Sequence, residues 1–509
     1  MAESPVPPEA DGTRTKLTTM MWLALIAAFL GWMFDGFEMG LYGIVTRPAL
    51  SELLGTDSER ALGMFTSMTI AAFLTGMAAG GLLFGRLGDR VGRVKAMAIA
   101  ILVYATFTGL SGLTHAWWQL AACRFIGAMG LGGEWGLGVA LVMESWPNAK
   151  RPVLAGLLGA AANFGFLASA GVGWLKVYLH WGWREPLWCG AIPALLVFAL
   201  RLGVKEPEKF VRSKERGETS RLRELFSPEF RRRTLIGSGL GAVAVLGMWG
   251  SYQMWLPMWA PRLAVPSMEK VTAAVQSAKA AQQEATAGAP TAAQALAKAR
   301  GALSEALPAA DEAAARNGAL RADAEAARQA SEKAETAAEL LAAAKSVGKT
   351  INPVTSAATA ATMQWMSIGS IVGALLGALI GDWLGRRRSY ALLCVLGIVA
   401  ALLLYLTSHD FGPRFLLFGA LAGLPITAFF GWLPLYLPEL YPTRLRATGE
   451  GFCFNVGRIV SAAGVFGTGA LCAALGNIPL AAAAMSVIFL FGLPIIALAP
   501  ETKGGELPE

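Results

Sequence analysis

The residues of this chain that could carry chemistry are charged side chains inside long apolar segments. Asp35 and Glu38 interrupt one apolar run, Arg124 and Glu134 interrupt another, and Arg458 lies in a third. A charged side chain at the centre of a bilayer costs about 2.5–3.5 kcal/mol or more on insertion scales. We expect a chain that keeps such charges to use them, so these five residues are the first candidates for a functional site.

Three of these charges fall at similar depths in their helices. Asp35 lies fifteen residues after Met20, about 22 Å along a helix that rises 1.5 Å per residue. Glu38 follows about one turn later on nearly the same face, and Arg124 is seven residues into an antiparallel segment. Asp35 and Arg124 are therefore predicted to pair, and protonation of Asp35 would release the pair, as proton coupling requires. A static pair that fixes helix packing is the alternative. Glu134 is either a second proton site or the holder of an interhelical hydrogen bond.

The composition requires a membrane around these segments. Apolar residues make up 55% of the 509 residues, charged residues make up 15%, and the mean hydropathy is +0.49. This share of charged residues is too small to cover the surface of a soluble domain. Apolar segments near the length of about 20 residues that spans a bilayer lie near 20–45, 61–84, 95–114, 117–142, 153–177, 186–204, 234–260, 360–380, 389–408, 413–437, 447–474 and 479–499. The sequence thus predicts an all-α membrane protein of twelve transmembrane helices.

Basic residues mark one side of the predicted membrane. The net charge is +8, and Lys and Arg gather in the loops that follow the even-numbered segments. The positive-inside rule accounts for this pattern without nucleic-acid binding. We therefore expect a bacterial inner-membrane protein with both termini in the cytoplasm. The basic loop residues are Arg86, Arg90, Arg93, Lys95, Lys150, Arg151, Arg231, Arg232, Arg233, Arg386, Arg387, Arg388, Arg444 and Arg446.

An internal repeat divides the chain into two halves. Three features recur at an offset of 293 or 295 positions: GDRVGR at 88–93 with GDWLGR at 381–386, ESWP at 144–147 with ELYP at 439–442, and Glu206 with Glu501. Three matches at nearly one offset predict two six-helix bundles in parallel repeat. This is the plan of transporters whose halves rock around a central binding site.

The repeat places two polar residues at equivalent positions near the middle of the membrane. Asn163 and Arg458 are 295 positions apart, and each lies about eleven residues from the basic side of its segment. Substrates bind near the midplane in this plan, and a guanidinium there can hold a carboxylate through two hydrogen bonds. Asn455 lies one turn before Arg458, and Tyr252 and Gln253 are further candidates for lining the site.

Each of these assignments has a plainer alternative. Arg458 would instead pair with Glu134 or Asp35, or extend to a lipid headgroup. Tyr252 and Gln253 would only pack against neighbouring helices.

The repeated loop motifs carry charges suited to a gate. Each copy has an Asp and an Arg four residues apart and a Glu in a later loop, so that ion pairs can bridge the helix ends. Such bridges would close the cytoplasmic side in one conformation and break in the other, while the glycines permit tight turns. The alternative is that the charges only set topology. The gating candidates are Gly88, Asp89, Arg90, Gly92, Arg93, Glu144, Asp382, Arg386, Glu439 and Arg446.

One segment breaks the repeat. Residues 264–355 are rich in Ala, with balanced charge, which predicts two or three solvated helices with breaks near Gly288–Pro290 and at Pro308. Glu312 and Arg316 have the i,i+4 spacing of a helix-stabilising pair. We expect the segment on the extracytoplasmic side, either as an inert helical hairpin or as a lid or partner-binding element.

These features predict how the chain is organised. The predicted parts are a cytoplasmic tail at 1–19, a six-helix half at 20–204, a cytoplasmic linker at 205–233, a second half at 234–499 interrupted by the insertion at 264–355, and a cytoplasmic tail at 500–509.

Several motifs resemble the major facilitator superfamily. Residues 85–95 (GRLGDRVGRVK) are similar to that family's signature between helices 2 and 3. Residues 35–38 (DGFE) resemble an element of the metabolite:proton symporters for aromatic acids, sialate and lactate-like acids, with Glu38 where Asp is usual. The resemblance implies an acid–arginine pair for proton coupling at Asp35 and Arg124. Further matches to this group or to sugar porters are residues 124–134, 144–147, 181–184, 438–449 and 500–504.

The predicted function is proton-coupled symport of a small organic anion, a carboxylate, by a monomer in the lipid bilayer. A sugar porter is the alternative within this class, and a transporter-fold sensor that signals through the insertion is the alternative from another class. Neither an enzyme nor a cofactor is expected, because no phosphate-binding loop is present and the five cysteines have neither metal nor disulfide spacing. His115, His180 and His409 likewise form no metal-binding cluster in the sequence.

Overall fold

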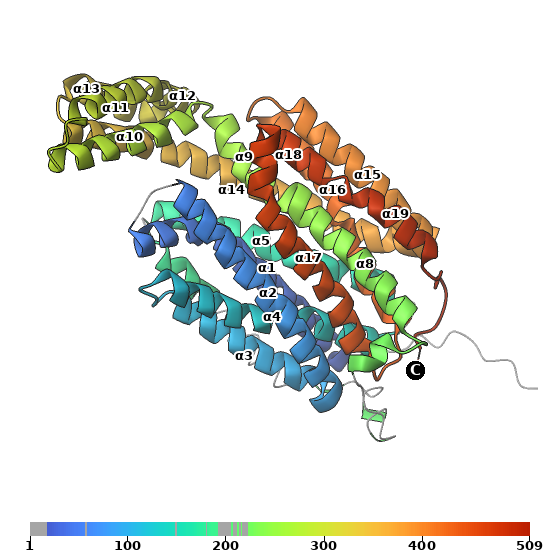
Figure 1. Cartoon of the computed structure of the whole chain (residues 1–509). Coiled ribbons are helices and arrows are strands. Elements are labelled where there is room, and N and C mark those ends of the chain that lie inside the picture. The colour runs from blue at the N-terminus through green and yellow to red at the C-terminus, as the bar shows by residue number, and fades with distance from the viewer. Residues whose placement is uncertain are drawn as a thin grey trace, which may run out of the picture.

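The computed structural model describes residues 18–508 apart from 56–58, 148–149, 180, 192–204, 207–210, 213–214 and 216–221. Most of the predicted tail at 1–19, of the sixth apolar segment and of the linker at 205–233 therefore lies outside the described residues, as does His180. The elements of the described part are helices, and the two halves lie side by side, the first in blue to teal and the second in green to red (Figure 1).

Five long helices form the part of the first half that the structure describes. They are α1 (Thr19–Leu54), α2 (Glu59–Val91), α3 (Arg93–Ser111), α4 (Trp117–Ser145) and α5 (Arg151–Tyr178), and residues 184–191 are also helical. The first two helices run beyond the predicted ends at residues 45 and 84, because a helix continues to satisfy backbone N–H and C=O groups after the apolar run stops. The helix α1 ends where Gly55 adopts a positive φ of 61°.

The second half contains the remaining long helices. They are α8 (Arg231–Met248), the π-helix η3 (Trp249–Gln253), α9 (Trp255–Ala264), α14 (Ala337–Leu384), α15 (Arg386–Thr407), α16 (Pro413–Tyr436), α17 (Arg446–Leu475), α18 (Ile478–Met485) and α19 (Ile488–Leu498). The predicted twelfth segment is divided, since α18 stops just before Ser486. Among the described residues, ten helical stretches are long and apolar enough to cross a membrane. Large apolar side chains such as Phe491 and Leu403 remain more than half exposed on their flanks, as a lipid-facing surface requires.

Residues 268–333 form four short helices at one end of the molecule. They are α10 (Met268–Thr286), α11 (Ala292–Ala306), α12 (Pro308–Arg316) and α13 (Arg321–Lys333), and they gather beside the start of α14 (Figure 1). The predicted breaks near Gly288 and at Pro308 are confirmed, but the expected number of two or three helices is too low. The 48-residue helix α14 begins at Ala337 within the predicted insertion and continues into the second half.

The expected pair of Glu312 with Arg316 is replaced by other contacts. Glu312 accepts hydrogen bonds from the amide and hydroxyl of Ser267 at 3.0 and 2.8 Å. Arg316 donates to the carbonyl oxygens of Phe411 and Leu263 at 2.9 and 3.3 Å. Glu312 therefore joins α12 to the start of α10, and Arg316 joins α12 to the second half, because backbone and hydroxyl groups near the two side chains compete with the local pair.

The two halves meet along helices that the repeat relates. The helix α17 packs on α2 and α4, and α5 packs on α14 and α16. Trp135 of α4 stacks on Phe454 of α17 with ring centroids 3.9 Å apart. Within the first half, a Cβ on Gly132 would lie 1.8 Å from the carbonyl oxygen of Met77. The absence of a side chain at Gly132 thus allows α4 to contact α2 closely.

Candidate functional site

Arg124 and Glu38 form a buried ion pair within the first half. The guanidinium of Arg124 on α4 donates to the carboxylate of Glu38 on α1, and both side chains are almost fully buried. Thr108 of α3 donates to the same carboxylate at 3.2 Å. The Arg124 guanidinium lies 4.4 Å from the ring centre of Tyr42, which adds a cation–π contact. Three helices of one half therefore fix this charge pair.

Glu38 takes the position that the sequence assigns to Asp35. The two acids are one helical turn apart, about 4.5 Å along the axis, which is within the error of a depth counted from an approximate helix end. The expected ion pair of Asp35 with Arg124 is therefore corrected to a pair of Glu38 with Arg124.

Asp35 instead interacts with Arg458 across the interface between the halves. Asp35 is fully buried on α1, Arg458 is 4% exposed on α17, and the two charges interact electrostatically. One nitrogen of Arg458 donates to the Asn455 side-chain oxygen at 2.9 Å and to the carbonyl of Gly132 on α4 at 3.4 Å. The Asn455 amide also reaches the Gly132 carbonyl at 3.5 Å. Arg458 is thus a cation buried inside the protein and faces neither lipid nor a headgroup.

The other candidate binding residues differ in their burial and in their hydrogen bonds. Asn163 of α5 and Glu134 of α4 are both buried. The Tyr252 hydroxyl donates to the carbonyl of Gly419 on α16 at 2.7 Å, so Tyr252 packs the second half together. Gln253 is only partly buried and ends a π-helix, η3, a local distortion that is frequent at functional sites. Gln253 therefore remains the better candidate of the two for contacting a ligand.

A network of buried charges closes the end of the molecule that carries the basic loops, here called the basic end. Arg93 pairs with Asp89 at 2.9 Å and with Glu144 at 3.3 Å. It also donates to the carbonyl of Gly88 at 3.0 Å. The motif at 88–93 and the acid at 144 thus come together in the first half, as their spacing predicts.

This network continues into the second half. Glu144 accepts from Arg446 at 3.1 Å, and Arg93 donates to the Thr443 carbonyl at 2.9 Å. Asp89 accepts hydrogen bonds from both the amide, at 3.0 Å, and the hydroxyl of Thr448. All of these contacts join α2, α3 and α4 to residues 443–448, which lead into and begin α17, so the basic end is closed in this conformation.

The second motif copy repeats the first within its own half. Arg386 forms two hydrogen bonds with Glu439 at 2.7 and 3.0 Å and donates to the carbonyl of Gly381 at 2.9 Å. Its contact with Asp382 is longer, 3.5 Å, and the Asp382 side chain is 52% exposed. The repeat is therefore asymmetric, because Asp89 is buried against the other half while Asp382 faces outward. Arg90 of the first copy is exposed.

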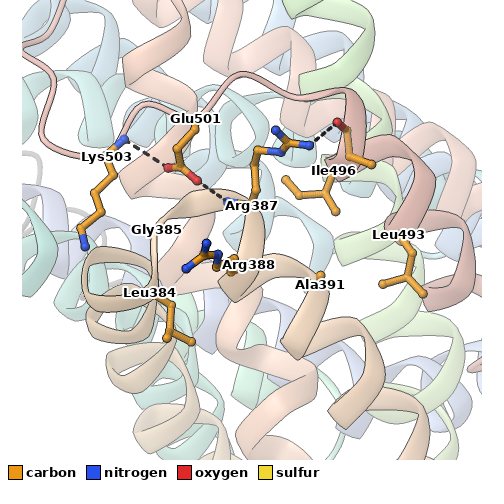
Figure 2. A pocket seen from close by; sticks show the side chains of 10 residues that line it. Leu384, Gly385, Arg387, Arg388, Ala391, Leu493, Ile496, Glu501 and Lys503 are labelled. Atoms are coloured by element: carbon orange, nitrogen blue, oxygen red, sulfur yellow. Dashed lines mark hydrogen bonds between the residues drawn. The ribbon is translucent and has the colours of Figure 1, made fainter.

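The two repeated glutamates cap equivalent helices. Glu206 accepts from the amides of Arg93, Val94 and Lys95 at the start of α3. Glu501 accepts from the amides of Arg386 and Arg387 at the start of α15, and Figure 2 shows its bond with Arg387. Burial raises the pKa of Glu206. Burial acts in the same direction on Glu501, but the backbone N–H donors around it outweigh burial and its pKa lies below the usual range.

The glycines that precede these caps have positive φ. Gly92 adopts φ 122° and Gly385 adopts φ 88°, conformations that residues with a Cβ rarely take. A Cβ at Gly92 would also lie 2.2 Å from the Glu206 carboxylate. Gly92 is therefore needed for both the turn and the cap.

A surface cavity lies beside the second cap. It is lined by residues of α14, α15, α19 and the chain end, including Arg387, Arg388, Leu493, Glu501 and Lys503 (Figure 2). All of its lining residues belong to the second half, so this cavity is separate from the interface at Arg458.

One buried acid was missed by the sequence reasoning. Glu450 lies in α17, one turn after Arg446, and is fully buried. The rule that a charge inside an apolar segment is a functional candidate, applied to Arg458 of the same segment, would have selected it. No cluster of metal-ligating side chains occurs among the described residues.

Two protein-family models match most of the chain. The sequence model of the Major Facilitator Superfamily matches residues 19–292, and that of the sugar (and other) transporters matches residues 311–503. A proton:xylose symporter, XylE, has the same fold, with a TM-score of 0.59 and 17% identity over 96% of this chain and 98% of that chain.

Three curated proteins share sequence with the chain. A probable 4-methylmuconolactone transporter of Cupriavidus pinatubonensis is 25% identical over 94% of this chain and 90% of its own length. A putative metabolite transport protein of Haemophilus influenzae is 32% identical over 48% of this chain and 60% of that protein. The sialic acid transporter NanX of Escherichia coli is 30% identical over 39% of this chain and 47% of that protein. The last two matches thus cover less than two thirds of the relatives.

Proposed function

Because the chain belongs to the major facilitator superfamily, a family of transporters rather than enzymes, we propose that it is a proton-coupled symporter of a small organic anion. The substrate is a carboxylate, and it crosses by alternating access between the two halves. Relatives whose names specify a sialic acid or 4-methylmuconolactone as cargo support a substrate of this kind.

The observation that carries this proposal is the buried cation Arg458 opposite the buried acid Asp35. Arg458 lies on α17 of the second half and Asp35 on α1 of the first. A substrate carboxylate that binds Arg458 must compete with the Asp35 carboxylate. A proton on Asp35 removes this competition, so proton binding favours anion binding. This linkage is what symport requires.

The Glu38–Arg124 pair supplies a second charge that protonation would change. It lies within the first half, held by Thr108 and Tyr42. We propose that it sets the packing of α1 against α4 and that protonation of Glu38 loosens this packing during the cycle. Asn455, Asn163, Gln253 and Glu134 are proposed to contribute to the same central region.

The charges of the basic end act as the cytoplasmic gate. With Glu144, Asp89 and Arg93 bound to the start of α17, this conformation is closed toward the cytoplasm. We propose twelve spans in a bacterial inner membrane, both termini inside, a monomeric unit, and the helices of 268–333 outside. Ten candidate spans and the basic loops support this arrangement.

A sugar porter is the second candidate. The sugar-transporter match over residues 311–503 and the fold shared with a xylose symporter favour it. A neutral sugar does not need a buried cation, whereas a carboxylate does, so Arg458 favours the anion.

Uptake into proteoliposomes under an imposed pH gradient tests the proposal. Labelled carboxylates should accumulate in vesicles containing the wild type, and sugars should not. Asp35→Asn should keep anion exchange but lose pH-driven accumulation, because Asn cannot release a proton. If only sugars accumulate, the protein is a sugar porter and the anion-symport proposal is wrong. If nothing is taken up, the result favours a transporter-fold sensor. Normal accumulation by Asp35→Asn would exclude Asp35 as the coupling site.

A further inference from the structure

Glu450 interacts electrostatically with the buried charges of the basic end and plays no part in the proposed cargo site. It is four residues after Arg446 on α17, and its side chain is fully buried. Neither of its carboxyl oxygens has a hydrogen-bond partner among the residues that the structure describes. Burying a carboxylate without such partners is strongly unfavourable.

Charged groups on four helices interact electrostatically with Glu450. They are Arg446 on its own helix, Asp89 of α2, Arg93 of α3 and Glu144 of α4. Tyr441 and Cys453 are the other titratable groups that interact with it. Arg151 of α5 lies further out, where it interacts with Arg446 and Glu439.

The hydrogen bonds of the two arginines that interact with Glu450 go to other groups. Arg446 donates from its three nitrogens to Pro438, Glu144 and Pro508. Arg93 forms ion pairs with Asp89 and Glu144 and donates hydrogen bonds to two carbonyl oxygens. If every group is ionised, two positive charges face three negative ones in a buried site. One added proton makes this cluster neutral.

We propose that Glu450 is a proton-binding site of the gate, protonated while the gate is closed. When α2 and α17 separate, water reaches the carboxyl group, its O–H bond breaks and the proton passes to water. Closing the gate takes a proton back. This inference rests on the gate proposed above and goes beyond the proposed symport, because it needs neither a substrate nor the acid Asp35.

Infrared spectroscopy of the purified full-length protein at pH 7, without substrate or gradient, tests the protonation. The wild type should show a carboxylic-acid C=O band that is lost in Glu450→Gln and retained in Glu501→Gln, because Glu501 is an exposed carboxylate bound to amides. An identical band in wild type and Glu450→Gln would overturn the proposal. If Glu450→Gln does not fold, Glu450→Asp replaces it. The band should then move in frequency, and an unmoved band would equally overturn the proposal.

Hydrogen exchange of residues 446–452 tests the gate. The ratio of the exchange rate in wild type to that in Glu450→Gln should rise with pH, approaching tenfold per pH unit, which is the limit for one proton. Comparing the two proteins at each pH cancels the intrinsic pH dependence of exchange. A constant ratio from pH 6 to 9 would overturn proton control of the gate. Both measurements are independent of uptake, so a failure here is distinguishable from a failure of the symport proposal.

Discussion

At the residue scale, the geometry of the Arg458 guanidinium matters more than its charge alone. One of its nitrogens binds both the Asn455 side chain and the Gly132 carbonyl. This anchoring orients the planar group, whose other donors remain able to meet a carboxylate. A lysine keeps the charge but cannot present two parallel donors.

We predict that Arg458→Lys weakens binding of the transported anion by roughly 10- to 100-fold, since a hydrogen bond to a charged group contributes about 1.5–3 kcal/mol. Titration calorimetry on purified protein measures the change. Arg388→Lys is the control, because Arg388 is exposed at the far flank of the second half. Equal anion affinity in wild type and Arg458→Lys would remove Arg458 from the binding site.

At the element scale, glycines decide how closely α2 and α4 approach. A Cβ on Gly80 of α2 would lie 1.8 Å from the carbonyl oxygen of Met129, and Gly132 of α4 has the same relation to Met77. Backbone atoms cannot move aside as a flexible side chain can. The helix pair that carries Arg124, Glu134 and Asp89 therefore depends on these positions.

We predict that Gly132→Ala destabilises the protein by about 1–3 kcal/mol or more, the usual cost of overpacking. Gly171→Ala in α5 is the matched control, because nothing lies within 4 Å of its added Cβ. Thermal unfolding in detergent should show a lower Tm for Gly132→Ala and an unchanged or slightly higher Tm for the control. Similar Tm values for the two variants would contradict the packing argument.

At the scale of the whole molecule, the repeat is symmetric in sequence but asymmetric in its contacts. Asp89 binds Thr448 of the other half, whereas the equivalent Asp382 is half exposed. The first motif copy therefore holds the halves together, while the second stabilises its own half through Arg386 and Glu439.

We predict that Asp89→Asn shifts the gate toward the open form by roughly tenfold, since it weakens charged hydrogen bonds worth about 1.5–3 kcal/mol. Asp382→Asn should have little effect. Spin labels at the exposed positions Arg90 and Arg388, one in each half, measure the distribution of distances between the two halves. Equal shifts for the two variants would argue against a gate built on the first copy.

The sequence alone determined the class of the molecule. Hydropathy, basic loops and the offset of 293 or 295 residues are local or periodic signals, so they indicate membrane helices and two related halves without any knowledge of packing. The same signals grouped Arg93 with Glu144 and Arg386 with Glu439, and they matched Glu206 with Glu501. That both glutamates cap helices is known only from the structure.

Only the tertiary structure decided which charges meet. Asp35 and Glu38 are one turn apart, and a helix end known to a few residues cannot tell which of them reaches Arg124. The electrostatic interaction of Asp35 with Arg458 and the inward position of Glu450 depend on how α17 is placed against the first half. That placement results from contacts between residues hundreds of positions apart, which no local pattern in the sequence encodes.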